Sequence, residues 1–213
     1  QLLMEPSLAP ALRASLLTGR AGAFSAGGRL EDAAEDLESA LAMPMADHML
    51  FRARALRRLG IVRERQGRIA EAIALVREAA EVSRQQNEPY GLTHALSALS
   101  MLVHRTGALE EAQSLLAEAR GHALRTKDAA IKGHLLGLVA TALFLTGQVG
   151  PDTESLVRVA VLAARDAGLP GNAVVLLTNL AHSLANRGRL EHALAELKQA
   201  LSLLQHAADL RRT

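Results

Sequence analysis

Apolar residues in this chain recur at the helical period, and the whole pattern then repeats along the sequence. The clearest copy is carried by Leu56, Leu59, Gly60, Gly67, Ala72, Val76 and Ala79. The first three share one helical face and the last three share another. Gly67 stands between the two runs, and helices commonly end at a left-handed residue that glycine adopts most cheaply. The segment therefore predicts a helical hairpin.

The same pattern recurs around five glycines. These are Gly28, Gly67, Gly107, Gly147 and Gly188, at intervals of 39, 40, 40 and 41 residues. Self-similarity at such a period is typical of stacked helical repeats, in which each repeat packs only on its neighbours. We therefore expect an all-α, right-handed α-solenoid of five helix-turn-helix repeats, with about ten antiparallel helices and a single domain over residues 1–213.

The repeats are expected at about 8–45, 46–86, 87–126, 127–168 and 169–210. The expected helices pair as 10–26 with 30–43, 46–66 with 69–86, 91–106 with 109–126, 128–146 with 151–168, and 172–187 with 190–210. Residues 1–8 are expected to form a ragged lead-in. Breakers such as Pro44, Pro89 and Pro170 lie in the predicted connections between hairpins.

The hairpin resembles the tetratricopeptide repeat, whose first helix carries Leu before Gly or Ala, and whose second carries Ala, a larger apolar residue and Ala. The matches in the third and fifth repeats are Leu99, Ser100, Ala112, Leu116 and Ala119, and Leu180, Ala181, Ala193, Leu197 and Ala200. The first repeat has Arg20 in place of Leu, as an end repeat with one uncovered face would. The fourth has Asp152 in place of Ala, and a one-residue insertion there would bring Ala160 into line.

The repeat period is close to 40 rather than the 34 usual in that family, so each helix is longer by about one turn. Long repeats in Ala- and Leu-rich sequences look like the sensor arms of LuxR- and SARP-type bacterial transcription regulators. They are also similar to scaffold proteins with 40-residue repeats. The resemblance implies an interaction or sensing module within a larger protein.

Composition narrows the function further. The chain has no cysteine, which excludes disulfides and thiolate zinc sites and is compatible with the cytoplasm, where we expect the protein. It shows no signal peptide, and its least polar stretch, 135–146, is too short to span a bilayer. It does not begin with Met, which indicates a fragment or a trimmed product. Phosphate-cradling loops, nucleophile elbows and metalloprotease motifs are missing, so we expect no enzyme and no cofactor.

Charge is nearly balanced. The 24 basic and 22 acidic residues give a formal net charge of +2. The pI of 9.5 is high because few side chains titrate between neutral pH and pH 9.5. Only four aromatic residues occur (Phe24, Phe51, Tyr90 and Phe144), too few for base stacking. We therefore expect neither direct nucleic-acid binding nor membrane binding.

In stacked hairpins the first helix of every repeat lines one wall, and its free face lies opposite the Leu-Gly face. This rule selects candidate groove residues: Arg54, Arg57, Ile61, Glu64, Arg65, His94, Ser97, Met101, His104, Arg105, His134, Gly137, Thr141, Phe144, Thr178, His182 and Asn186. Arginine suits carboxylate or phosphate, so a groove that is basic in its N-terminal half favours an acidic segment or a small anion.

The charges also have a purely structural interpretation. The helix over 30–43 is acidic and the next helix carries six arginines, so many of these charges can pair across the surface for little energy. The basic-then-Asn clamp of chaperone-binding relatives is absent from the equivalent positions. The histidines lie on separate helices, so we expect solvated side chains rather than a metal site, although a pH-sensitive groove stays open.

The leading hypothesis is a non-catalytic module that binds a peptide or protein segment in its groove, as part of a larger bacterial regulator or adaptor. A small-molecule-sensing arm and a self-association module are the alternatives. The last helix stays apolar through Leu201, Leu203, Leu204 and Leu210. Terminal repeats normally have a polar outer face, so this end is expected to pack on something further.

Overall fold

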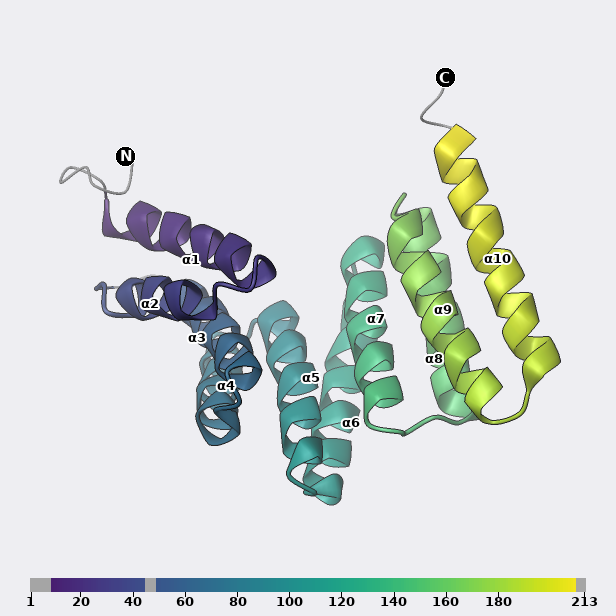
Figure 1. The fold of residues 1–213 in the computed structure, drawn as a ribbon, viewed down its shortest axis with the longest axis horizontal. Coiled ribbons are helices and arrows are strands. Elements are labelled where there is room, and N and C mark those ends of the chain that lie inside the picture. The colour runs from purple at the N-terminus through teal and green to yellow at the C-terminus, as the bar shows by residue number, and fades with distance from the viewer. Residues whose placement is uncertain (1–8, 45–48, 210–213) are drawn as a thin grey trace. The chain divides into compact units, whose positions relative to one another are not determined.

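A computed structural model describes residues 9–44 and 49–209, and within these residues all regular structure is α-helical (Figure 1). The described helices are α1 (Pro10–Ala26), α2 (Leu30–Leu41), α3 (Met49–Arg65), α4 (Ile69–Gln85), α5 (Pro89–Arg105), α6 (Leu109–Arg125), α7 (Ala129–Leu145), α8 (Pro151–Asp166), α9 (Pro170–Asn186) and α10 (Leu190–Asp209). The prediction of helix-turn-helix repeats is therefore confirmed. The expected lead-in, 1–8, lies outside the described residues.

The chain divides into two compact units, Gln1–Glu111 and Ala112–Thr213. Unit 1 contains α1 to α5 and the first turn of α6, and unit 2 contains the rest of α6 and α7 to α10. The prediction of one continuous domain stays a prediction.

Two helices begin earlier than predicted, at Pro89 and Pro170 rather than at 91 and 172. Each proline occupies the first helical turn, where its fixed φ suits the helix and its missing N–H is not needed. Glu88 caps α5, because its carboxylate accepts hydrogen bonds from the backbone N–H groups of Tyr90 at 3.0 Å and Gly91 at 2.5 Å. Pro89 and Pro170, which the sequence analysis placed in connections, therefore begin helices, whereas Pro44 lies outside any helix as predicted.

The five hairpin turns share one backbone geometry. Each of the five repeat glycines has a positive φ, between 70° and 85°. In every turn the N–H of the residue after the glycine bonds the carbonyl five positions earlier, as Arg68 does to Arg63 at 2.8 Å and Arg189 to Leu184 at 2.9 Å. This is the hydrogen bond of a Schellman motif, which satisfies carbonyls left open at a helix end. The glycine period therefore fixes where each hairpin turns.

Small residues set the spacing of the helices within a hairpin. Gly60 of α3 is buried against α4, and Ala72 and Ala79 of α4 are 0% and 1% exposed. A Cβ atom on Gly60 would lie 3.1 Å from the carbonyl oxygen of Ala72, closer than an ordinary contact. Small residues therefore allow α3 and α4 to approach each other closely.

The fourth hairpin contains the predicted insertion. Asp152 is exposed, and the next residue, Thr153, occupies the buried position that alanine has in the other repeats, at 5% exposure. Val157 and Ala160 follow it into the core and are fully buried. The Thr153 hydroxyl donates a hydrogen bond to the carbonyl oxygen of Gln148 at 2.8 Å, which satisfies this polar group inside the hairpin.

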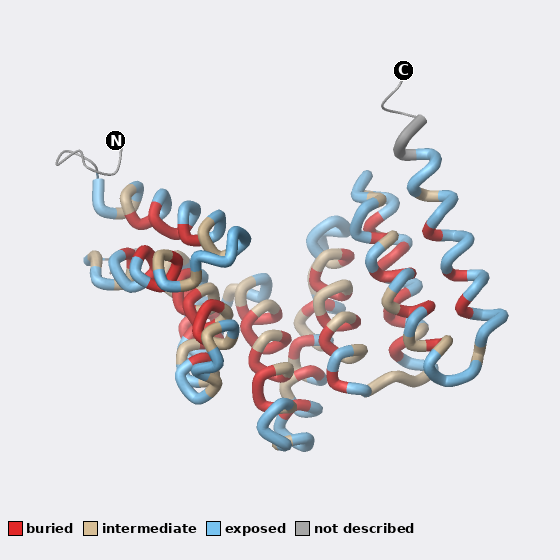
Figure 2. The backbone as a smooth tube through the Cα atoms, viewed as in Figure 1, coloured by how far each residue is buried: buried red, intermediate tan, exposed pale blue. Residues whose placement is uncertain are grey.

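Contacts between repeats distinguish the two faces of each unit. Consecutive helices pack against each other from α1 to α5 and from α7 to α10, and in addition α3 approaches both α1 and α5, while α7 approaches α9. No comparable approach joins α2 to α4, or α8 to α10, in the part of the chain that the structure describes. Within each unit, the first helices of neighbouring repeats therefore lie side by side. Figure 2 shows buried positions concentrated between packed helices and few of them on α10.

Candidate functional site

The predicted groove residues lie on the first helices, which form one wall in each unit. We call the α1, α3 and α5 surface of unit 1 the first-helix wall of unit 1, and the α7 and α9 surface the first-helix wall of unit 2. Most candidates are accessible there. The exposed ones are Arg54, Arg65, Arg105, Thr178, His182 and Asn186, and the half-buried ones are Arg57, Ile61, Glu64, His94, Met101, His104, His134, Gly137, Thr141 and Phe144.

Ser97 differs from the prediction, because the structure buries it at 4% exposure. Its hydroxyl has no hydrogen-bond partner among the described residues, and its backbone carbonyl accepts a hydrogen bond from the Ser100 hydroxyl at 2.7 Å. The centre of α5 packs against neighbouring helices on more than one side, so the helical face selected by spacing is partly covered there. Ser97 is therefore not available to a ligand on this wall.

Three predicted wall residues are already engaged within unit 1. Arg105 of α5 forms an ion pair with Glu64 of α3 at 2.6 Å between Nη1 and Oε1. Arg65 donates hydrogen bonds to the backbone carbonyl and, at 2.8 Å, to the hydroxyl of Ser25 at the end of α1. These contacts join corresponding positions of adjacent repeats. At this end of the wall, the structural interpretation of the charges holds.

Arg54 and Arg57 are different. Neither forms a hydrogen bond or an ion pair with any residue that the structure describes, although Arg57 is half-buried. Burial lowers the pKa of the Arg57 guanidinium from its ordinary value, and the nearby positive charges of Arg58 and Arg54 lower it further. A charge held in such a place without a counterion is costly, which makes it a candidate for an anionic ligand.

Sequence reasoning missed two residues of this cluster. Arg58 lies beside Arg57, and its Nη1 donates a hydrogen bond to the carbonyl oxygen of Thr18 in α1 at 2.6 Å. Burial, together with Arg54, lowers the pKa of Arg58. Tyr90 of α5 is 42% exposed, and its ring lies 4.8 Å from the His94 ring, centroid to centroid. The four-residue spacing of Tyr90 and His94 was the signal available in the sequence.

Three arginines of α3 and two rings of the neighbouring helix α5 are named here the arginine cluster: Arg54, Arg57, Arg58, Tyr90 and His94. α3 and α5 pack against each other, and Tyr90 is among the groups that act on the pKa of Arg57, so the α3 and α5 parts of the cluster lie near one another. Guanidinium groups donate several hydrogen bonds in a fixed fork, which matches carboxylate or phosphate oxygens. The cluster can therefore bind an anionic group.

The first-helix wall of unit 2 contains a small apolar cavity of about 160 Å³ between α7 and α9. Its lining residues are Gly133, His134, Gly137, Leu138, Thr141, Asn172, Val175 and Leu176. Of the predicted residues, His134, Gly137 and Thr141 line the cavity. Asn172 and Val175 also line it but were not predicted, because the residues selected on α9 begin only at Thr178. Gly137 offers no side chain to fill the space.

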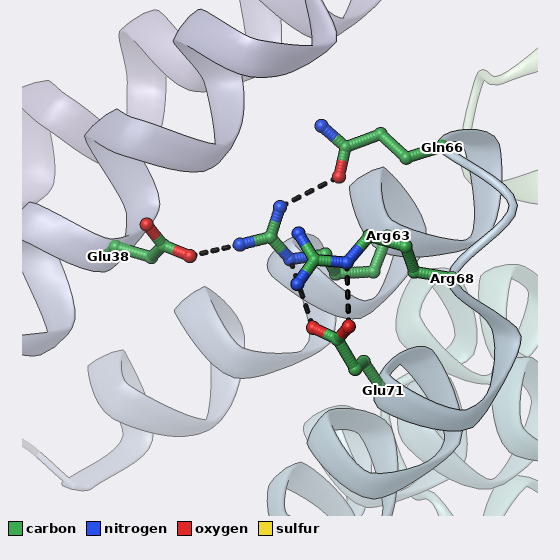
Figure 3. Close-up of polar contacts among 5 residues, drawn as sticks. All are labelled: Glu38, Arg63, Gln66, Arg68 and Glu71. Atoms are coloured by element: carbon green, nitrogen blue, oxygen red, sulfur yellow. Dashed lines mark hydrogen bonds and ion pairs between the residues drawn. The ribbon is translucent and has the colours of Figure 1, made fainter.

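A second group of charges lies between α2, α3 and α4 and is fully engaged (Figure 3). Arg63, 8% exposed, forms ion pairs with Glu38 of α2 and, at 3.7 Å, with Glu71 of α4. It also donates a hydrogen bond to Gln66 at 2.7 Å, and Arg68 pairs with Glu71 at 2.6 Å. This arrangement ties three helices together and gives both guanidinium groups a carboxylate partner, in contrast to Arg54 and Arg57.

The described residues contain no group of three or more histidine and acidic side chains that could hold a metal ion. None of the helices that the structure describes is long and apolar enough to cross a membrane.

Comparison with known proteins agrees with the hairpin geometry. Two tetratricopeptide repeat families match the sequence, one over residues 51–125 and one over residues 175–203. The chain therefore contains tetratricopeptide repeats, as the resemblance predicted. This fold generally serves as a non-catalytic scaffold for protein interactions. A search of curated proteins found no match.

Solved structures share the fold at low sequence identity. BtubC (BKLC) from P. vanneervenii is 14% identical with a TM-score of 0.71, over 93% of this chain and 82% of its own. A kinesin light chain repeat protein from Podosopora anserina is 18% identical, with a TM-score of 0.67 and coverage of 96% and 98%. A Rap protein complexed with Competence and Sporulation Factor is 14% identical, with a TM-score of 0.71. The match covers 92% of this chain and 55% of the Rap chain, so this chain spans about half of its length.

Proposed function

We propose that this chain is a non-catalytic interaction module whose first-helix wall in unit 1 binds an extended, acidic segment of a partner protein. The observation that carries the proposal is the pair Arg54 and Arg57, which lie on the wall without a counterion among the described residues. All other arginines named on α3 have partners within the fold: Arg52 pairs with Glu78, Arg58 bonds Thr18, Arg63 pairs with Glu38, and Arg65 bonds Ser25.

The chemistry of the arginine cluster favours carboxylates. A carboxylate bound between Arg54 and Arg57 would replace water around a guanidinium whose charge is already partly desolvated, so most of the desolvation cost is met before binding. Charge-assisted hydrogen bonds of this kind contribute about 1.5–3 kcal/mol each. The neighbouring Tyr90 ring supplies an apolar surface for the stem of an acidic side chain.

The cavity of unit 2 supports a peptide ligand over a metabolite. Its volume of about 160 Å³ is smaller than the roughly 300–1,000 Å³ of pockets that enclose drug-sized molecules. A space of that size suits one apolar side chain of a bound segment.

The resemblance of the long repeats to regulator sensor arms, and the Rap structure in its complex, support placing the module in a larger bacterial regulator.

The cavity also carries the second candidate function, a small-molecule-sensing arm. A ligand that binds only the folded state raises the melting temperature by mass action. A thermal-shift screen of metabolites, repeated with Val175→Phe to fill the cavity, tests it. A shift lost in that variant would favour sensing, and its absence across the screen would count against it.

The proposal is tested by capture from lysate of the presumed bacterial host. Three proteins are compared at equal helicity: the original chain, Arg54→Gln/Arg57→Gln, and the control Arg120→Gln/Arg165→Gln. The control removes the same charge from exposed positions of second helices. We expect one acidic protein to be retained by the original chain and the control only. Equal retention by all three proteins would place the binding site elsewhere.

A further inference from the structure

The cavity between α7 and α9 owes part of its space to a glycine at the centre of α7. Gly137 stands ten residues before the repeat glycine Gly147. The residues at the same place in the other repeats all carry larger side chains, and they are Thr18, Arg57, Ser97 and Thr178. Gly137 therefore removes a side chain from the first-helix wall of unit 2 at the point where the cavity of about 160 Å³ lies.

Packing does not require this glycine. A Cβ atom on Gly137 would lie 3.5 Å from Cδ1 of Leu176, which is an ordinary contact. Gly133, one turn earlier, is different, because a Cβ atom there would lie 2.7 Å from Cβ of Ala163 in α8. Glycine inside a helix destabilises it relative to alanine, so Gly137 carries a cost that close packing does not explain. Local departures of this kind are expected at functional sites.

The lining of the cavity suits an uncharged apolar group. Among the described residues it contains no acidic residue, lysine or arginine, and its aliphatic side chains are Leu138, Val175 and Leu176. The Thr141 hydroxyl donates a hydrogen bond to the carbonyl oxygen of Gly137 at 2.9 Å, so its proton is already engaged. A cavity of roughly 150 Å³ accepts a molecule of benzene, so this one accepts a single large apolar side chain. The mainly aliphatic lining favours leucine.

Asn172 adds a polar group to the same cavity. The residue is exposed, and its side-chain amide forms no hydrogen bond with any residue that the structure describes. A side-chain amide offers both a donor and an acceptor, which match the C=O and N–H groups of a peptide bond. An apolar cavity beside an unused amide fits a residue within a peptide better than a free hydrocarbon.

We propose that the cavity is a specificity pocket that binds one leucine side chain of the partner segment, while the Asn172 amide bonds the backbone of that segment. Gly137 sets the size of the side chain that the pocket accepts. The inference rests on the proposed function, because the occupant belongs to the same partner. All residues of the pocket lie in unit 2.

The first test uses N-acetylleucinamide, which carries the leucine side chain between two amide groups and has no charge. NMR spectra of the full chain report binding through the methyl signals of Val175 and Leu176. We expect saturable shifts of these signals with N-acetylleucinamide and much smaller shifts with N-acetylalaninamide. The absence of shifts with the leucine probe, or equal shifts with both probes, would overturn the proposal.

The second test separates a binding role of Gly137 from a structural one. Gly137→Ala should raise the melting temperature by about 2–4 °C, because alanine favours the helix and its Cβ fits. The same variant should bind N-acetylleucinamide about tenfold or more weakly, because the added methyl group occupies the pocket. The control is Gly19→Ala on α1, where an added Cβ meets no atom within 4 Å. It should stabilise the protein without affecting the probe. Unchanged affinity or a lowered melting temperature in Gly137→Ala would contradict the proposal.

The third test concerns Asn172. Asn172→Ala should weaken N-acetylleucinamide by about 2- to 10-fold, which corresponds to the loss of one or two hydrogen bonds. Isobutanol, which has the branched apolar group without the amides, should bind more weakly than the leucine probe and should be insensitive to this substitution. Equal affinity for isobutanol and N-acetylleucinamide would make the cavity a site for small apolar molecules and overturn the peptide assignment.

The probe also separates the pocket from the arginine cluster. Because N-acetylleucinamide has no carboxylate, Arg54→Gln/Arg57→Gln should bind it as the original chain does. If an acidic peptide binds the original chain but the probe does not, the pocket is wrong and the proposed function stands. If the probe binds but the acidic peptide does not, the role of the arginine cluster is wrong and the pocket stands.

Discussion

Gly60 of α3 lies directly against Val76 of α4, so close that a side chain at position 60 would overlap Val76. A Cβ atom there would lie 2.4 Å from Cγ2 of Val76. This contact sets the separation of the two helices in the second hairpin, and Leu59 and Val76 bury the apolar surface on either side of it.

Gly60→Ala is therefore expected to destabilise the fold, by about 1–3 kcal/mol, because the helices must separate or a side chain must leave its rotamer. Gly19→Ala on α1 is the control, since an added Cβ there meets no atom within 4 Å. It should stabilise by up to about 1 kcal/mol through helix propensity alone. Urea unfolding of both variants measures the difference, and equal effects would contradict the close packing.

Arg63→Met is expected to destabilise unit 1. The substitution keeps an apolar stem but removes the ion pairs with Glu38 and Glu71 that join α2, α3 and α4. Because Arg63 is buried and its partners are half exposed, we expect a loss of about 1–3 kcal/mol. Arg68→Met, at an exposed position, should cost less than about 1 kcal/mol. Thermal unfolding compares the two, and a larger effect at Arg68 would contradict this role of Arg63.

Arg57→Met should leave the free energy of unfolding unchanged or raise it. The pKa of Arg57 is lowered in the folded state by burial and by Arg58 and Arg54, so the charged form is disfavoured relative to the unfolded chain. This penalty applies at every pH at which the arginine is charged and would lessen only as the pH approaches its pKa. The difference between the two proteins should therefore be constant between about pH 6 and pH 9.

Thermal unfolding at low salt, with and without phosphate, checks this expectation. Phosphate should raise the melting temperature of the original chain more than that of Arg57→Met, because it supplies the missing counterion. A clear loss of stability in Arg57→Met would show that its charge is already satisfied within the fold.

The hairpins and their core faces could be predicted from the sequence because their determinants are local. Within one repeat, the turn depends on the positive φ of Gly67. The buried face depends on the spacing of Ala72, Val76 and Ala79, and all three are buried as the helical period predicts. The one-residue insertion before Thr153 could also be predicted, because it too shifts the apolar spacing within a single repeat. Leu197 is the exception. It matches the buried repeat position but is 45% exposed, because its burial depends on a helix that would follow α10.

The state of the arginines could not be predicted, because it depends on contacts between repeats. Arg65 reaches Ser25 and Arg105 reaches Glu64, partners 40 and 41 residues away in the chain. Nothing in the local pattern separates these arginines from Arg54 and Arg57. Ser97 was misplaced for the same reason, since neighbouring helices cover part of the face that helical spacing selected on α5.

The most direct test of the interaction role is a fluorescence-anisotropy titration with a labelled, extended peptide that alternates Glu with apolar residues. We expect saturable binding that weakens about tenfold or more in Arg54→Gln/Arg57→Gln and is unchanged in Arg120→Gln/Arg165→Gln, because each lost charge-assisted contact contributes about 1.5–3 kcal/mol. Replacing Glu by Gln in the peptide should reproduce the loss. Equal affinity of all three proteins for the peptide would contradict the assignment of the arginine cluster as a binding site.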